Sequence, residues 1–322
     1  AIMSSTRGAV TMKFLNELHD YDAVDDVYYC RNAEVGIAKN GNAYLKTELV
    51  DKTGTIRAFK WNSDGELAAK VNKQYVKVCG IVSKYNDSLT MTINSIRVAR
   101  SDEFSQEDYV ACSKWDKQIM LAELNKLIDS VDDRGYELLL RSFFQHDKEF
   151  LEKFVNGSAA KSIHHNFNGG LLEHTLWVAT LCGSLAHQYD GVNRDLLVTA
   201  ALLHDVGKVV ELTPAPECNY TTEGELLGHV VIGTLMIHDK ARMIPEISHE
   251  SLVKLEHCIL AHHGKLEYGS PKVPSLTEAI ILSTADNLDA KVFVAEALLG
   301  KSTDNEGWTP YSQILETRIH EG

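Results

Sequence analysis

The stretch RDLLVTAALLHDVGK (194–208) is an apolar run that ends on a histidine, an aspartate, a glycine and a lysine. Its apolar residues recur at spacings of three and four, which is typical of one face of a helix. Neighbouring side chains on a helix point about 100° apart, so His204 and Asp205 can serve one site only at a helix end or a bend. Gly207 permits such a bend. The stretch therefore predicts a helical domain with a polar site at the end of an apolar helix.

Five more ionisable side chains interrupt apolar helical stretches in the same third of the chain: His174, His229, His262, His263 and Asp286. Any one of these histidines alone is more often a hydrogen-bonded core residue than a metal ligand. Buried polar groups without partners are costly, however, so seven of them together need a common explanation. Imidazole and carboxylate groups bind divalent metals, and seven are enough for two metals that share one carboxylate. Because two adjacent metals recur in phosphoester cleavage, we expect a metallophosphohydrolase.

Three basic side chains near these residues each allow two interpretations. Lys208 follows Asp205 by three positions, and it either caps the end of a helix or holds a substrate phosphate beside the metals. His164 and His165 lie about ten residues before His174 in a glycine-broken loop. They are either ordinary loop residues or groups that bind phosphate and shuttle protons.

Residues 24–100 alternate apolar and polar side chains in five stretches, which predicts five β-strands. A helical stretch at 64–71 falls between the third and the fourth, the pattern of an OB-fold barrel. Residues 101–117 are polar and lack this alternation, so we expect a linker there, and from 118 to 322 the periodicity is helical. The fold class is therefore multidomain, a small all-β OB-fold barrel followed by an all-α domain. Residues 1–23 receive no role.

The net charge of −13 is unevenly distributed along the chain. Residues 24–100 hold twelve Lys and Arg against eight Asp and Glu, a balance of +4, which leaves −17 for the remainder. This asymmetry favours a module that binds single-stranded nucleic acid, attached to an acidic catalytic body. The alternative is a solvated strand surface that is rich in lysine.

Single strands are held by aromatic stacking and by cations along a groove. The candidate stacking residues are Tyr44, Phe59, Trp61 and Tyr85, and the candidate cations are Lys46, Arg57, Lys60, Lys77 and Lys84. Phe59 and Trp61 share parity, so we expect them on one face of a strand. For each aromatic side chain taken alone, the alternative is a place in the barrel core.

Six cysteines without CxxC spacing suggest reduced thiols and a cytoplasmic setting. No apolar run approaches the ~18–20 residues of a membrane span, so we expect no membrane partner. The sequence leaves a homo-oligomer open.

The order of these motifs resembles a known family. His174, His204-Asp205 and Asp286 fit the H…HD…D pattern of the HD-domain metal-dependent phosphohydrolases. From about residue 24 to its end, the chain resembles the YhaM-type 3′–5′ exoribonucleases, which join an OB-fold to an HD domain. The stretches that carry this resemblance are DKTGTIRAFKW (51–61), AAKSIHHNFNGGLLEHT (159–175), ALLHDVGK (201–208), EGELLGHVVIG (223–233), AHHG (261–264), ADNLDAK (285–291) and WTPYS (308–312).

The resemblance implies a ligand set and an activity. It implies that His174, His204, Asp205 and Asp286 bind one metal, and that Asp205 bridges to a second metal at His229, His262 and His263. It implies that Lys208 contacts the scissile phosphate, and that the substrate is single-stranded RNA, with single-stranded DNA as a further candidate, degraded from the 3′ end to nucleoside monophosphates. The mixed His/Asp set suits Mn²⁺ best, with Fe²⁺ or Co²⁺ as alternatives, rather than Mg²⁺.

Two other functions fit the same residues. An HD phosphodiesterase or phosphohydrolase for cyclic or short signalling nucleotides would carry the same metal ligands. A non-catalytic module that binds nucleic acid around a structural metal is the third reading, and the seven-residue set argues against it because structural sites close around one metal.

Overall fold

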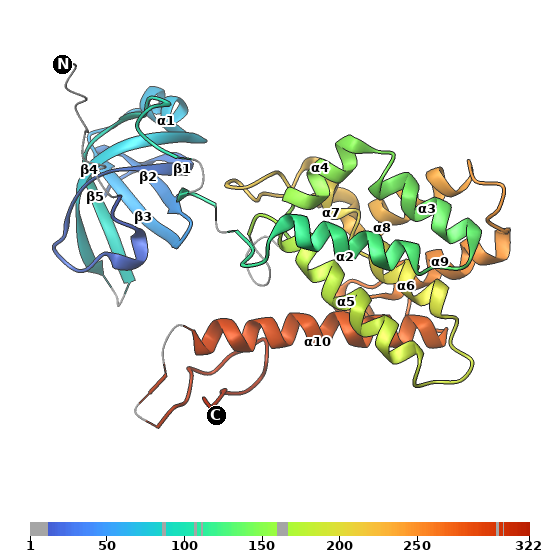
Figure 1. The fold of residues 1–322 in the computed structure, drawn as a ribbon. Coiled ribbons are helices and arrows are strands. Elements are labelled where there is room, and N and C mark those ends of the chain that lie inside the picture. The colour runs from blue at the N-terminus through green and yellow to red at the C-terminus, as the bar shows by residue number, and fades with distance from the viewer. Residues whose placement is uncertain are drawn as a thin grey trace, which may run out of the picture. The chain divides into compact units, whose positions relative to one another are not determined.

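The computed structural model comprises two compact units, Ala1–Ala111 and Cys112–Gly322 (Figure 1). The residues that the structure describes are 12–85, 88–105, 108–110, 112–159, 167–300, 303–304 and 306–322. His164 and His165 lie outside the described residues.

The first unit is a closed five-stranded barrel, which confirms the predicted small all-β fold. Its strands are β1 (Ala23–Ile37), β2 (Ala43–Asp51), β3 (Gly54–Trp61), β4 (Gln74–Tyr85) and β5 (Ser88–Val98). They pair in the order β1-β2-β3-β5-β4, and only the β3–β5 pair is parallel. Helix α1 (Gly65–Val71) connects β3 to β4 and begins at Asp64, whose side chain accepts a hydrogen bond from the Leu67 amide. The barrel therefore has the strand and helix order predicted for an OB-fold.

The barrel core is built from alternate strand residues, including the fully buried Tyr28, Leu45 and Met91. Leu15 and Leu18 belong to the segment 1–23, for which no role was predicted, and both are buried in the same cluster. Part of the predicted linker also belongs to this unit.

Two aromatic residues of the predicted linker, Phe104 and Tyr109, pack on the barrel. Phe104 stacks on Tyr75 with ring centroids 4.1 Å apart, and the buried Tyr109 donates a hydrogen bond from its hydroxyl to the Val27 carbonyl, 3.1 Å away. The polar composition of the stretch hid these two aromatic anchors. The structure divides the chain between 111 and 112, inside the predicted linker, while the boundaries expected at 23/24, 100/101 and 117/118 stay predictions.

The turn between β2 and β3 is organised by Asp51, which is only 4% exposed. Its Oδ1 accepts hydrogen bonds from the Thr53 amide (2.7 Å), the Thr53 hydroxyl (2.6 Å) and the Gly54 amide (3.1 Å). Its Oδ2 accepts one from the Leu15 amide at 2.6 Å. One carboxylate therefore closes the turn and fixes the N-terminal segment on the barrel.

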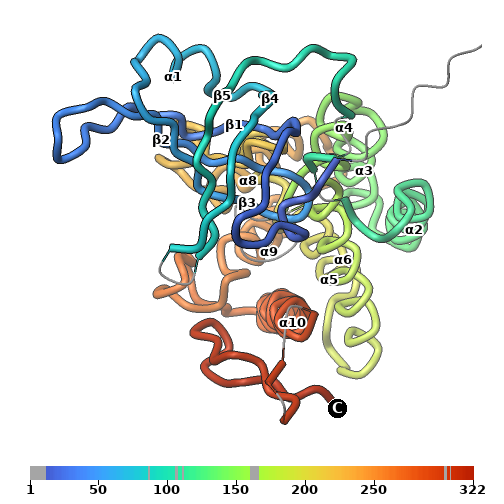
Figure 2. Tube along the Cα trace, turned by 90° about the vertical axis from the view of Figure 1, so that its left-hand side faces the viewer, coloured from blue at the N-terminus to red at the C-terminus, as the bar shows by residue number. Residues whose placement is uncertain are grey.

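The second unit is helical. Its helices are α2 (Lys117–Asp129), α3 (Arg134–Phe144), α4 (Lys148–Asn156), α5 (Gly170–Ala186), α6 (Arg194–Leu203), α7 (Lys208–Glu211), α8 (Thr222–Ala241), α9 (His249–Ala261) and α10 (Thr277–Leu299), with a short 3-10 turn, η3, at Leu266–Tyr268. Every residue of α6 from Leu196 to Leu203 is buried. Helix α5 packs along α6, and α10, seen nearly end on in Figure 2, packs against both. Among the described residues, no helix is long and apolar enough to cross a membrane.

Replacing Asp51 by alanine removes the shared acceptor of four hydrogen bonds and leaves the buried Leu15 amide and the partly buried Thr53 donors unpaired. We expect the free energy of unfolding of the barrel to fall by roughly 2–4 kcal/mol. Hydrogen exchange of the β2 and β3 amides in the full chain measures this loss separately from the helical unit. The exposed Asp102, replaced by alanine, is the control and should leave exchange unchanged. Equal protection in the Asp51 variant and the parent chain would contradict this account of the turn.

Candidate metal centre

The seven predicted ligands come from five helices and meet at one place in the helical unit. His174 lies in α5, and Asp286 lies in α10. His204 ends α6, and Asp205 follows it in the turn before α7. His229 lies just after a kink in α8, and His262 and His263 follow the end of α9. Each therefore sits at a helix end, a kink or a buried helix face.

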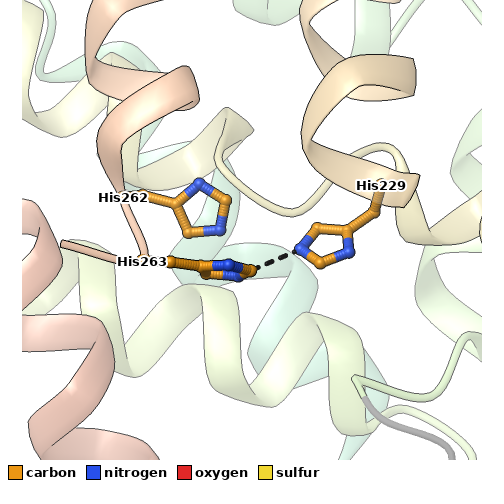
Figure 3. A group of neighbouring side chains, drawn as sticks. All are labelled: His229, His262 and His263. Carbon is orange, nitrogen blue, oxygen red and sulfur yellow. Dashed lines mark hydrogen bonds between the residues drawn. The ribbon is translucent and has the colours of Figure 1, made fainter. Parts of the chain in front are cut away.

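The predicted ligands other than Asp205 form two groups, and the ligand atoms of each group lie within 4.8 Å of one another. The first group is His174, His204 and Asp286. The second is His229, His262 and His263, drawn in Figure 3, where His229 reaches across from α8 toward the α9 end. The Nε2 atoms of His229 and His263 are 3.3 Å apart, and those of His174 and His204 are 3.1 Å apart.

Asp205 lies between the two groups and turns one oxygen toward each. Its Oδ2 is 3.5 Å from His174 Nε2 and 3.4 Å from His204 Nε2. Its Oδ1 is 3.5 Å from His229 Nε2 and 3.8 Å from His262 Nε2. The side chain is 2% exposed. A carboxylate in this position can share its two oxygens between two cations.

Every one of the five histidines has an acceptor at Nδ1. The Nδ1 atoms of His204 and His262 lie 2.8 Å and 2.6 Å from the carbonyls of Ala201 and Ile259, one turn earlier. His263 Nδ1 lies 3.1 Å from the Tyr268 carbonyl. Carbonyl oxygens only accept hydrogen bonds, so in a neutral ring the proton resides on Nδ1 and the Nε2 lone pair points inward.

The two remaining histidines are held by carboxylates that the sequence analysis missed. His174 Nδ1 is 2.7 Å from Asp289 Oδ2, and His229 Nδ1 is 2.9 Å from Glu211 Oε1. Asp289 could have been found, because it follows Asp286 by three positions and so shares its helix face. Glu211 has no comparable signal in the sequence, because its partner lies across a kink eighteen residues away.

Two buried atoms at the centre of the site lack a hydrogen-bond partner among the described residues: Asp205 Oδ1 and His262 Nε2. Both are acceptors, and they lie 3.8 Å apart. Leaving a buried acceptor unpaired costs about 1–3 kcal/mol, more for a charged one. A cation at this place would satisfy both atoms, so the residues present fit a divalent metal site.

The site electrostatics favour bound cations. Burial alone would raise the pKa of Asp205, but Lys208 and His204 hold it well below its usual range. Burial lowers the pKa of His262 well below its usual value, with a further contribution from His263. Burial also acts to lower the pKa of His174, but hydrogen bonds to Asp286 and Asp289 outweigh it and raise that pKa to about 9. The carboxylates therefore stay ionised and His262 stays neutral, as metal ligands must be, whereas His174 carries a proton that a bound metal would displace.

Lys208 pairs with the site rather than with a helix end. Its Nζ lies 2.6 Å from Asp205 Oδ2, and its side chain is 10% exposed. It is the first residue of α7. Its predicted contact with a substrate phosphate stays a prediction.

A second candidate site lies on the barrel surface. A groove of about 540 Å³ is lined by Tyr44, Arg57, Phe59, Trp61, Ser83, Lys84, Tyr85 and Thr90. Tyr44 pairs with Trp61, and Lys46 pairs with Phe59, across β2 and β3, so the two predicted aromatic residues do share one face. The rings of Tyr44 and Trp61 are 5.2 Å apart, and Trp61 is 52% exposed. Lys60 has the opposite parity in β3 and does not line this groove.

Comparisons with known proteins give the class of the helical unit first. Residues 171–291 match the HD domain family, and an HD domain implies a divalent-metal site. The chain is 35% identical to the 3′-5′ exoribonuclease YhaM of Geobacillus sp. (strain WCH70) over 299 residues, which are 92% of this chain and 91% of that protein. The chain belongs to the family of this exoribonuclease.

Two solved structures overlap parts of the fold. The second OB-fold domain of replication protein A from Methanococcus maripaludis matches 28% of this chain and 97% of that chain, with 21% identity and a TM-score of 0.24. RecG bound to a three-way DNA junction matches 55% of this chain and 26% of that chain, with 13% identity and a TM-score of 0.25. Neither overlap is close enough to bear on function.

Gly207 allows the turn after Asp205 to approach α8 closely. A Cβ at this position would lie 2.1 Å from the His229 carbonyl oxygen, a backbone atom that cannot rotate away. We expect Gly207→Ala to lower the free energy of unfolding of the helical unit by roughly 1–3 kcal/mol. Thermal denaturation measures the loss. Gly183→Ala is the matched control, because a Cβ there meets only a Val198 methyl group, 3.7 Å away. Equal stability of the two variants would show that the approach is not constrained.

Proposed function

We propose that this chain is a metal-dependent 3′–5′ exonuclease that hydrolyses single-stranded RNA to nucleoside monophosphates, with single-stranded DNA as a further candidate substrate. The observation that carries the proposal is the carboxylate of Asp205, whose two oxygens face two separate histidine groups. Membership of the exoribonuclease family supports the substrate class and the direction of digestion.

The ligands divide naturally around Asp205. His174, His204 and Asp286 would hold one metal with Asp205 Oδ2, and His229, His262 and His263 would hold the other with Asp205 Oδ1. The mixed nitrogen and oxygen donors favour Mn²⁺, with Fe²⁺ or Co²⁺ next. The metals held there would neutralise phosphate charge and make a water molecule nucleophilic at neutral pH.

The chain's own side chains orient the substrate. Lys208 is a cation beside Asp205 with its Nζ at the edge of the cluster, where it would contact the scissile phosphate and oppose its negative charge. On the barrel, Tyr44, Phe59 and Trp61 would stack on successive bases while Arg57 and Lys84 pair with phosphates.

The groove also favours a polymeric substrate, because a cyclic or short nucleotide that binds at the metal centre would not need a second site on another domain.

Metal-dependent digestion of RNA and DNA oligomers labelled at either end tests the proposal. Release of labelled mononucleotide first from the 3′ end is the expected result. Hydrolysis of cyclic nucleotides with intact oligomers would contradict it. A cytoplasmic setting and a homo-oligomer both stay predictions.

Replacing Asp205 by asparagine keeps the shape of the side chain but removes the shared charge. We expect digestion to slow by more than about 100-fold, because even residues that only support a metal ligand cost 10–100-fold. Circular dichroism should show an intact fold. Glu256→Gln is the control, since Glu256 pairs with His238 away from the cluster and should leave the rate unchanged. Near-normal turnover by the Asp205 variant would overturn the assignment of the site.

Replacing Trp61 by alanine removes an exposed stacking surface from the barrel groove. We expect the Kd for a long single-stranded RNA to rise roughly 5- to 150-fold, corresponding to ~1–3 kcal/mol per stacked base. Fluorescence anisotropy with chelator present measures binding without digestion. Trp115→Ala, at a residue that is 53% exposed in the other unit, is the control. Unchanged affinity in the Trp61 variant would mean that the groove is not the clamp, and a partner-binding role for the barrel would then lead.

A further inference from the structure

Helix α8 is interrupted immediately before a candidate metal ligand. Gly228 has φ 73° and ψ 154°, a conformation that side chains other than glycine rarely adopt. The helix therefore restarts at His229, whose backbone N–H has no carbonyl one turn earlier to donate to. An acceptor from elsewhere in the fold has to take that hydrogen bond.

Glu211 supplies that acceptor and holds the imidazole ring as well. Its Oε1 accepts the backbone N–H of His229 at 2.9 Å and lies 2.9 Å from Nδ1 of the same residue. The Glu211 side chain is 10% exposed, and that of His229 is 13% exposed. Hydrogen bonds to a charged acceptor with little water access are strong ones. One carboxylate oxygen thus fixes both the start of the second helical segment and the direction in which Nε2 points.

The short helix α7 carries both Glu211, which holds His229, and Lys208, which contacts Asp205 at the centre of the site. Lys208, its first residue, pairs with Asp205 Oδ2, and Glu211, its last, holds His229. In the other group, Asp289 on α10 lies 2.7 Å from His174 Nδ1 and orients that ring. The remaining three histidines use backbone carbonyls, which side-chain substitution does not remove.

We propose that Glu211 is the positioning residue of the His229, His262 and His263 group and sets the metal affinity of that group alone, while Asp289 does the same for the His174, His204 and Asp286 group. This inference rests on the proposed two-metal function. It assigns no contact between either carboxylate and the metal or the substrate. Each acts through the histidine that it orients.

The test is a titration of metal-free full-length protein with Mn²⁺, by calorimetry and by counting bound ions with electron paramagnetic resonance. The parent chain should bind two ions. Glu211→Ala should leave one site unchanged and weaken the other roughly 10- to 100-fold, the usual effect of losing such a support. Glu211→Gln should recover most of that loss, because its amide oxygen can accept both hydrogen bonds.

A second substitution identifies which site is affected. In a chain that already carries His263→Ala, adding Glu211→Ala should not change the affinity of the remaining site, whereas adding Asp289→Ala should weaken it 10- to 100-fold. Melting of each metal-free variant checks the fold. Glu211→Asp, which keeps the charge but retracts it by one methylene, replaces Glu211→Ala if that variant does not fold, and it should show the same selective loss.

Three outcomes would overturn the inference. The first is that Glu211→Ala lowers the Mn²⁺ affinity of both sites equally. The second is that it lowers the affinity of neither site. The third is that, in the His263→Ala chain, it lowers the affinity of the remaining site. A parent chain that binds one ion would overturn the two-metal proposal and this inference with it. The ion count of the parent chain is known before any substitution is made at Glu211 or Asp289. Failure of the two-metal proposal is therefore distinguishable from failure of the inference about these two residues.

Discussion

The carboxylate of Asp205 is the constraint on which the helical unit depends. It is buried and ionised, and its two oxygens face different groups of imidazole nitrogens. Placing it there requires the turn between α6 and α7 to approach the kinked α8 closely, since a Cβ at Gly207 would lie 2.1 Å from the His229 carbonyl oxygen. A buried negative charge in this setting is stable only with cations beside it. Lys208 provides one, and the orphaned atoms Asp205 Oδ1 and His262 Nε2 mark where others belong.

The backbone positions the ligands around Asp205 as much as side-chain contacts do. Gly207 lets the turn after Asp205 pass against the His229 carbonyl, and Gly228 restarts α8 so that His229 faces inward. Carbonyls one turn earlier, at Ala201 and Ile259, orient His204 and His262. Because α6 and α9 deliver their ligands at a helix end, adjacent residues such as His204 and Asp205, or His262 and His263, can serve one site, which a regular helix would forbid.

The sequence predicted the parts of this structure that depend on local pattern. Strand alternation in 24–100 predicted the barrel, and apolar periodicity interrupted by His204, His229 and Asp286 predicted the helical unit and its cluster. It did not reveal Glu211, whose partner lies across a kink, or the burial of Tyr109 by the barrel. Lys60 does not line the groove, because strand parity places it on the other face of β3, and its predicted contact with substrate stays a prediction. These features depend on contacts between residues that are far apart in the sequence, which the spacing of neighbouring residues does not predict.

The central claim is that Asp205 bridges two metal ions. Anomalous X-ray diffraction at the manganese absorption edge, from crystals grown with Mn²⁺, tests it directly. The account predicts two anomalous peaks, one beside His174, His204 and Asp286 and one beside His229, His262 and His263, with the Asp205 carboxylate bound to both. A single peak, or a second peak that Asp205 does not touch, would contradict it.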